Sequence, residues 1–256
     1  MKKSSHMIIG AIPIMVILAG WYLITRLGYL PELMFPSPQA VFERFLKILD
    51  TGYKGHTLWE HLLASLRRLG LAYLLAIVTA IPAGLISGYS PNIRAALDPI
   101  ISFYRPLPPL AYYTILVLWM GIEDDSKITL LFLAGLAPIY ISCVSGVARM
   151  RADYVNGAKT LGANRLQIFF YVVFPVTLPD IFVGLRTALG SMYSTLVAAE
   201  MVAAVSGIGW MVLDASKYLQ SDVIFVGIII MGLTGIILDA GLNLAERKIV
   251  FWKGHN

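Results

Sequence analysis

Long uncharged runs alternate with short charged segments along the chain, and six of the apolar runs are long enough to cross a membrane. The hydrocarbon core of a bilayer is about 30 Å thick, which takes about 20 helical residues to span. The pattern predicts an all-α fold that is integral to the membrane, with a single transmembrane domain over residues 1–256. The six expected spans are residues 7–27, 61–90, 99–122, 127–148, 178–204 and 223–245.

The first apolar run follows Lys2 and Lys3, as the apolar part of a secretory signal peptide would. No small-residue cleavage site follows it, and Trp21 and Tyr22 suit an anchor at the membrane interface. We therefore expect this run to be retained as the first span.

The third run is interrupted by Arg105 and by Pro106, Pro108 and Pro109. Prolines remove backbone donors, so they should unwind the helix locally. Irregular backbone at membrane depth is tolerated only where it is buried in protein or lines a cavity. The third span is therefore expected to be broken beside such a cavity.

A shorter amphipathic segment lies between the first two spans, at residues 37–49. Val41, Phe45 and Leu49 fall on one face of a helix there, while charged side chains fall elsewhere. We expect this helix to rest on the outer membrane interface.

Composition supports a bilayer environment. The chain is 58% hydrophobic and only 14% charged, whereas soluble domains are roughly a quarter charged. The net charge of +5 is a weak indication of nucleic-acid binding, because basic cytoplasmic loops give membrane proteins the same excess. We expect no nucleic-acid partner. Cys143 is the single cysteine, which excludes an intrachain disulfide.

Basic residues favour an orientation with both termini in the cytoplasm, since an even number of spans puts the termini on one side. Arg67 and Arg68 fall on the outer side and weaken this bias. The segments placed inside hold Lys2, Lys3, Arg94, Arg149, Arg151, Lys159, Arg165, Arg247, Lys248 and Lys253.

The loop between the fourth and fifth spans, residues 149–176, has a distinctive spacing of helix-breaking residues. Residues 152–161 can form a short helix that Gly162 would terminate, because glycine adopts the left-handed conformation readily. Residues 165–174 then supply a second segment, and Pro175 is expected to break it before the next span. From physics alone this is either a rigid projecting unit or a simple connector.

The order Asn156-Gly157-Ala158, then Gly162, then Pro175 resembles the cytoplasmic loop of ABC importer permeases. That family's usual pattern begins Glu-Ala-Ala, keeps the glycine and ends Ile-x-Leu-Pro. Asn156 and Gly157 depart from it, which leaves the role of an acidic side chain there open. In the family, this loop inserts a coupling helix into a groove on the ATPase subunit. The resemblance implies that role for Asn156, Gly157, Ala158, Lys159, Thr160, Leu161, Gly162, Ala163 and Arg165.

Further segments resemble the branch of permeases that serves taurine, aliphatic sulfonates and nitrate. They read YRPLPPLAY at 104–112, GLRTALG at 184–190, STLVAAEM at 194–201 and GIGWMV at 207–212. The first and third are most similar to taurine permeases. The resemblance implies six transmembrane helices in a type I ABC importer permease fold, in the bacterial cytoplasmic (inner) membrane. It implies a path for taurine or a similar small sulfonate that a binding protein delivers, with nitrate or another small solute as the alternative.

The chain contains no G-x-x-x-x-G-K-[ST] phosphate loop, so it cannot cradle ATP itself. Gly207-Ile208-Gly209 is only a glycine pair in an expected outer loop. The resemblance implies two ATP-binding subunits, which carry ATP and Mg²⁺, and a second copy of this chain. We expect no cofactor and no metal on the chain itself.

Two other classes of protein fit less well. An intramembrane enzyme would need a catalytic motif, and neither H-E-x-x-H nor G-x-S-x-G is present, so no catalytic residue is assigned. A secondary transporter would be expected to carry coupling carboxylates near the midplane. Beyond Glu200, only Asp180 and Asp239 are candidates, and both lie toward the cytoplasmic end.

Charged groups within spans cost about 2.5 to 3.5 kcal/mol at the helix centre, so they normally face protein or water. Arg186 lies where it would snorkel to the inner interface, and Glu200 would either gate the path or pair with a base. Hydroxyl groups would serve as donors to a sulfonate, although the tyrosines equally suit interfacial packing. The candidate path residues are Arg105, Pro106, Pro109, Tyr112, Tyr113, Ser191, Tyr193, Ser194, Thr195 and Glu200.

Small residues recur four apart on the fifth span, where Gly184 precedes Ala188 and Ser191 precedes Thr195. Such pairs allow two helices to approach closely. They would serve either packing within the chain or contact between two copies.

Overall fold

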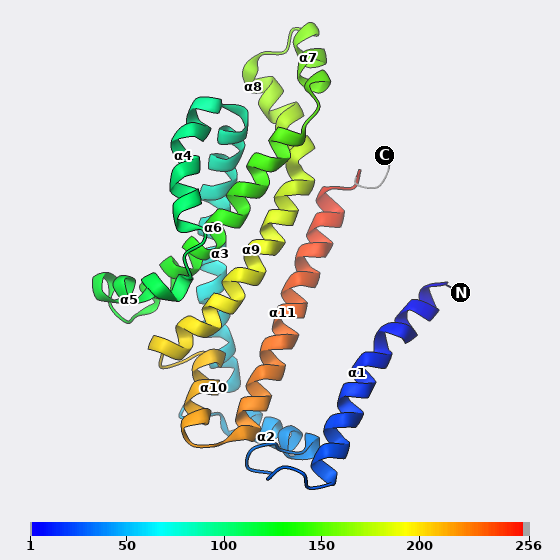
Figure 1. Cartoon of the computed structure of the whole chain (residues 1–256), viewed down its shortest axis with the longest axis vertical. Helices are drawn as coiled ribbons and strands as arrows, with labels where there is room; N and C mark the ends of the chain where they lie inside the picture. Colours follow the sequence, from blue (N-terminus) through cyan, green and yellow to red (C-terminus); the bar gives the residue numbers. More distant parts are fainter. Residues whose placement is uncertain (1, 253–256) are drawn as a thin grey trace.

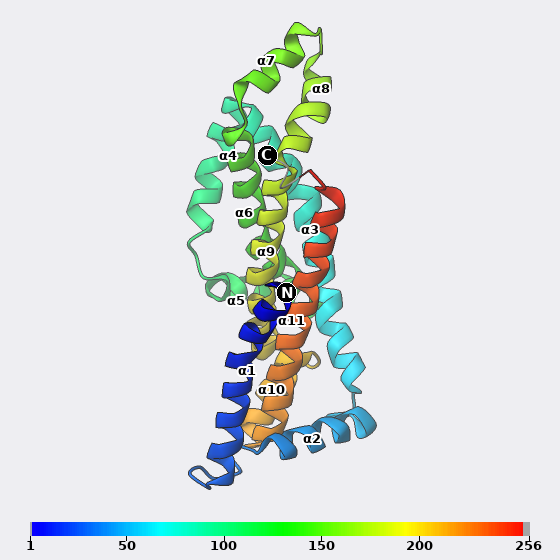
Figure 2. The same ribbon diagram turned by 90° about the vertical axis from the view of Figure 1, so that its right-hand side faces the viewer.

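The computed structural model describes residues 2–252, with side chains described from residue 12 onward. The molecule is elongated (Figures 1 and 2): α7 and α8 lie at one end, here called the α7 end, and α2 and α10 lie at the other, the α2 end. Within residues 2–252 the elements are α1 (Lys2–Arg26), α2 (Pro38–Thr51), α3 (Leu58–Tyr89), α4 (Pro91–Tyr104), α5 (Pro109–Met120), α6 (Asp124–Arg149), α7 (Ala152–Thr160), α8 (Arg165–Ile168), the π-helical turn η1 (Phe169–Val173), α9 (Phe174–Ala203), α10 (Ile208–Lys217) and α11 (Ser221–Ile249).

Long apolar helices dominate this architecture. Among the described residues, four helical segments are long and apolar enough to cross a membrane, namely Leu58–Tyr89, Asp124–Arg149, Arg165–Ala203 and Ser221–Ile249. Each contains one of the ranges expected for spans two, four, five and six, apart from the last residue of the ranges 61–90 and 178–204. The range expected for the first span, 7–27, falls on α1 apart from its last residue.

The third expected span consists of two helices, because the chain is unwound between Tyr104 and Pro109. The proline-rich sequence therefore breaks the helix, as its residues predicted. α4 has 14 residues and α5 has 12, so at 1.5 Å per residue they reach only about 21 Å and 18 Å. Neither alone spans a hydrocarbon core of about 30 Å. Figure 1 shows α5 turning away from the direction of α4.

The predicted break at Pro175 is wrong, since the chain stays helical from Arg165 to Ala203. The reason is the π-helical turn η1, in which Phe174 N–H donates to the Phe169 carbonyl five residues back. A widened turn accommodates the ring of Pro175 and the donor that it lacks. The second loop segment is thus continuous with the fifth span.

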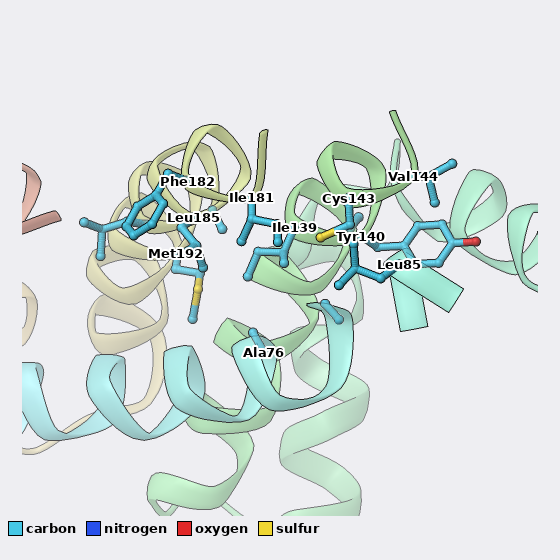
Figure 3. Packing of buried hydrophobic residues seen from close by; sticks show 14 of the residues in the cluster. Ala76, Leu85, Ile139, Tyr140, Cys143, Val144, Ile181, Phe182, Leu185 and Met192 are labelled. Atoms are coloured by element: carbon cyan, nitrogen blue, oxygen red, sulfur yellow. The ribbon is translucent and has the colours of Figure 1, made fainter. Parts of the chain in front are cut away.

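The core lies where α3, α6 and α9 pack together. α3 presents a stripe of small buried residues to α6, consisting of Ala72, Ala76, Ala80 and Gly84. A Cβ added at Gly84 would lie 2.7 Å from Cys143 Cβ and 2.8 Å from the Tyr140 carbonyl, so only glycine permits this approach. Figure 3 shows larger side chains, including Ile139 and Met192, packed in the same cluster.

The small residues of α9 serve packing within the chain. A Cβ on Gly184 would lie 2.6 Å from Ser142 Cβ on α6. Ala188 is fully buried in the core, and Ser191 donates a hydrogen bond to the Ala134 carbonyl of α6 at 3.0 Å. The sequence left open whether these residues pack within the chain or between two copies, and the structure shows them packed against α6 of the same chain.

The amphipathic helix predicted after the first span is α2. Ser37 caps it by accepting the Ala40 N–H at 3.2 Å. Val41 and Ile48 are buried against α10 and α11, whereas Phe42 is exposed. α2 therefore ties the start of α11 to the rest of the α2 end.

α1 stands apart from the other helices along most of its length (Figure 1). Ile12, Ile14 and Ile17 are each about half exposed or more. Contact is made near its C-terminal end, where Trp21 stacks on Phe225 and donates to the Pro36 carbonyl at 2.9 Å. The first turn of α1 and the last turn of α11 both point toward the α7 end (Figure 1).

A buried ion pair joins the helices near the α2 end. Arg68, only 4% exposed, binds Glu200 at 2.8 Å and Asp124 at 2.7 Å. Glu200 also accepts hydrogen bonds from Ser65 Oγ at 2.8 Å and from Gly209 N–H at 2.9 Å. We call Arg68, Glu200, Asp124, Ser65 and Gly209 the Arg68 cluster; it connects α3, α6, α9 and α10.

The Arg68 cluster explains two features that the sequence did not resolve. Arg68 weakened the charge bias because it falls near the outer end of the second expected span, whereas its side chain points into the bundle. The expected outer loop at residues 207–209 is the start of α10, whose first N–H groups bind Ser65 and Glu200. A carboxylate at a helix N-terminus is stabilised by the free N–H groups and the helix dipole.

We predict that Arg68→Met lowers the free energy of unfolding by about 3 to 5 kcal/mol, because it leaves the buried Glu200 carboxylate without its cation. Denaturant unfolding in detergent micelles measures this change. Arg94→Met is the matched control, since the Arg94–Asp98 pair is exposed and should cost less than about 1 kcal/mol. Equal losses in the two variants would contradict a stabilising role for the cluster.

Candidate functional site

The loop that follows α6 is a rigid unit projecting from the α7 end (Figures 1 and 2). α7 ends at Thr160, and two residues later Gly162, with a φ of +81°, lies in the left-handed region. Gly162 N–H donates to the Lys159 carbonyl, and Ala163 N–H donates to the Ala158 carbonyl, each at 3.0 Å. This pair of bonds is the Schellman arrangement that closes a helix and reverses the chain. The prediction of a glycine-terminated helix is confirmed.

α8 begins with a reciprocal cap. The Asn164 side chain accepts the Gln167 N–H at 2.9 Å, and the Gln167 side chain accepts the Asn164 N–H at 2.8 Å. The Asn-x-x-Gln spacing is a sequence signal for this cap, although the cap was not among the features predicted for the loop. Because both sides of the turn are fixed by hydrogen bonds, α7 and α8 form one unit.

Large apolar side chains are exposed on this unit and on η1, which continues it at the same end of the molecule. Leu161 is 90% exposed, Tyr171 80% and Leu166 70%. Exposed apolar groups of this size outside a bilayer indicate a surface that a partner covers. A hollow of about 360 Å³ beside them is lined by Ala158, Leu161, Gly162, Ala163, Gln167 and Tyr171, among others.

The remaining predicted loop residues lie on the same unit. Asn156, Gly157, Lys159 and Thr160 belong to α7, and Arg165 is the first residue of α8. Thr160 Oγ1 donates to the Gly157 carbonyl at 2.7 Å. The side chain of Asn156 is exposed, so the position where the family carries an acid faces outward.

A second hollow, of about 520 Å³, lies between the α4–α5 link, α6 and α9; we call it the link cavity. Its position fits the sequence argument that unwound backbone at membrane depth lines a cavity. It brings together six of the residues predicted for a path, which are Arg105, Pro109, Tyr112, Ser191, Ser194 and Thr195. Thr187 and Ser142 also line it, and neither was predicted from the sequence.

Arg105 is the charged group of the link cavity. Its side chain is exposed, and within the described residues its guanidinium has no hydrogen-bond or ion-pair partner. No other residue lining the cavity in the described part of the chain is charged. An unpaired guanidinium offers five donors in a planar fork that suits an oxyanion.

The hydroxyl groups of α9 were expected to donate hydrogen bonds to a solute, but each donates its proton to a backbone carbonyl instead. Ser191 donates to the Ala134 carbonyl at 3.0 Å, while Ser194 and Thr195 donate to the Ser191 carbonyl at 2.9 and 2.8 Å. Thr187 donates to the Val183 carbonyl at 2.9 Å. A hydroxyl has one proton, so each of these groups presents acceptor lone pairs to the cavity.

Four predicted path residues lie elsewhere. Pro106 belongs to the link but does not line the cavity. Tyr113 is buried and donates to the Ala199 carbonyl at 3.4 Å. Tyr193 donates to the Met231 carbonyl at 2.9 Å and faces a separate hollow of about 750 Å³ between α9 and α11. Glu200 belongs to the Arg68 cluster. Of the two roles considered for it, gating the path or pairing with a base, the structure shows the pairing.

Arg186 is paired as well. Its Nε and Nη2 atoms bind the two carboxylate oxygens of Asp239 at 3.0 and 3.1 Å, and Asn243 donates to the same carboxylate at 3.1 Å. The expectation that Arg186 would snorkel is therefore replaced by a bidentate pair between α9 and α11. Asp239, considered as a coupling carboxylate, is the partner of this arginine.

Comparison with known proteins identifies the family. Residues 80–251 match the family described as binding-protein-dependent transport system inner membrane component. The chain is 42% identical to the taurine transport system permease protein of Escherichia coli strain K12 over 240 residues, which are 93% of this chain and 87% of the relative.

Two further relatives belong to the same branch. A putative aliphatic sulfonates transport permease protein of Escherichia coli strain K12 is 36% identical over 92% of this chain and 88% of its own length. The nitrate import permease protein of Leptolyngbya laminosa is 34% identical over 83% of this chain and 77% of its own length. The chain therefore belongs to the family of binding-protein-dependent transport system inner membrane components, and its helices form a type I ABC importer permease fold.

Proposed function

We propose that this chain is the permease subunit of an ATP-driven importer and forms the translocation path for taurine or a similar small sulfonate. The observation that carries the proposal is the unit of α7 and α8, which projects from the α7 end with Leu161 almost fully exposed. The relatives named for taurine and aliphatic sulfonate transport support the choice of substrate.

The energy for import comes from another chain. ATP and Mg²⁺ are bound by partner ATPase subunits, and this chain carries no catalytic residue and binds no cofactor. The α7–α8 unit docks on the ATPase, with Leu161 of the turn and Tyr171 of the adjacent η1 as the apolar contacts. Each chain offers one such unit, so two copies of the chain would engage two ATPase subunits.

The α7 end faces the cytoplasm of a bacterial cell in this proposal. The first turn of α1 and the last turn of α11 point the same way, which supports cytoplasmic termini (Figure 1). An extracytoplasmic binding protein delivers the solute at the opposite, α2 end. The solute then passes the link cavity, where the Arg105 guanidinium attracts its anionic group.

We predict that Leu161→Asp weakens association with the ATPase subunit at least about tenfold, because a charge replaces an apolar contact at the centre of the interface. Co-purification of the assembled transporter measures the effect. Leu219→Asp makes the same change at an exposed leucine in the turn between α10 and α11 and should leave ATPase binding unchanged. Intact association of the Leu161 variant would refute the docking role.

Replacing the cavity cation should slow transport without disturbing assembly. Arg105→Gln is expected to lower sulfonate uptake into proteoliposomes roughly tenfold, the loss expected when a hydrogen-bonded charge is removed. Arg105→Lys keeps the charge but loses the planar fork, so its uptake should be intermediate. Full uptake by the Gln variant would exclude Arg105 from the path.

Nitrate is the alternative substrate, because a relative is named for nitrate import and one guanidinium can serve either anion. The melting temperature of the cognate binding protein separates the two. We expect taurine to raise this temperature and nitrate to leave it unchanged. A rise with nitrate alone would replace the sulfonate by nitrate and leave the permease architecture as proposed.

A further inference from the structure

We infer that the link cavity itself distinguishes an amino sulfonate zwitterion from a plain anion, with Arg105 binding the sulfonate and the α9 hydroxyl oxygens accepting hydrogen bonds from the ammonium group. This inference rests on the proposed function. It adds a second contact, on a different helix, for the opposite end of the substrate.

The first contact comes from the α4–α5 link. Arg105 is exposed, unpaired within the described residues, and the single charge among the described residues that line the cavity. This contact recognises any small oxyanion, so it does not separate a sulfonate from nitrate.

The second contact comes from α9. Thr187, Ser191, Ser194 and Thr195 all line the cavity, and each hydroxyl donates its proton to a backbone carbonyl at 2.8 to 3.0 Å. Each hydroxyl oxygen therefore presents only its lone pairs to the cavity, and lone pairs accept hydrogen bonds but cannot donate them. A second anionic group would be repelled there, whereas an ammonium with three donors fits.

The spacing of these residues supports a common face. They follow one another at intervals of four, three and one along α9, so they fall on adjacent turns of one side of the helix. An ammonium group that moves along the cavity therefore meets successive acceptors. The solute can advance without losing all its hydrogen bonds at once.

A plain alkanesulfonate would meet this face with an apolar tail. The hydroxyl oxygens would then lose contact with water and gain no donor, which is unfavourable for a polar group. Nitrate would occupy the Arg105 contact alone. The cavity therefore favours a solute with an ammonium group a short distance from a sulfonate.

Proteoliposomes that contain the complete transporter and its binding protein provide the test. Uptake of taurine and of ethanesulfonate is measured at concentrations that saturate the binding protein, and each variant is compared with wild type for each solute. The binding protein is the same throughout, so its own preference cancels. Thr195→Val removes an acceptor with little change in shape and should lower taurine uptake roughly five- to tenfold. Ethanesulfonate uptake should change less than about twofold.

Thr79→Val is the matched control, because Thr79 makes the same bond to the Leu75 carbonyl, at 2.8 Å, on an exposed part of α3. It should change neither uptake. Ser194→Ala, at an exposed position, repeats the test without affecting a buried site. Equal losses for the two solutes in the Thr195 and Ser194 variants would overturn the inference alone. A wild-type transporter that carries neither sulfonate would overturn the proposed function and this inference with it.

Discussion

The interior of a bilayer contains no water, so each backbone polar group and each charge in a spanning segment needs a partner in the protein or a place beside an aqueous cavity. The helices depart from regular geometry in two proline-containing segments, at Pro175 and between Tyr104 and Pro109, and this constraint applies to the latter, which lies inside an expected span. At Pro175 the chain stays helical by widening into a π turn, so the ring and the missing donor are accommodated without a break. Between Tyr104 and Pro109 it unwinds instead, and the open backbone lies along the link cavity.

The charged groups follow the same constraint in two different ways. Arg68 and Glu200 are withdrawn from lipid and satisfied within the bundle, where their pairing also fixes the start of α10. Arg186 is satisfied by Asp239 on a neighbouring helix. Arg105 alone among these arginines has no partner in the described chain, and it lines a cavity. The presence of a charge alone therefore does not mark a group as available to a solute. What marks it is the absence of a partner, because the paired arginines hold helices together.

The sequence predicted what depends on local chemistry. Uncharged length predicted the long helices, the prolines predicted the break after Tyr104, and Gly162 predicted the end of α7, because each signal acts within a few residues. The sequence could not show which side chains meet across helices. Arg68 looked like an unpaired cation at the outer end of the second span because its partners are 56 and 132 residues away. The hydroxyls of α9 looked like donors, because their bonds to carbonyls depend on rotamers that the residue type does not reveal.

A transport site must release its solute, which limits how strongly it can bind each end. A carboxylate 4 Å from the ammonium would add about 4 kcal/mol at an effective dielectric of 20, on the order of a thousandfold in affinity. Most differences in affinity appear as slower dissociation, so such a carboxylate would slow passage. The link cavity has neutral oxygens on α9 instead, among them Ser194 and Thr195. Neutral acceptors can distinguish an ammonium from a methyl group while holding it weakly, so the ammonium contact proposed for the cavity would be selective without trapping the solute.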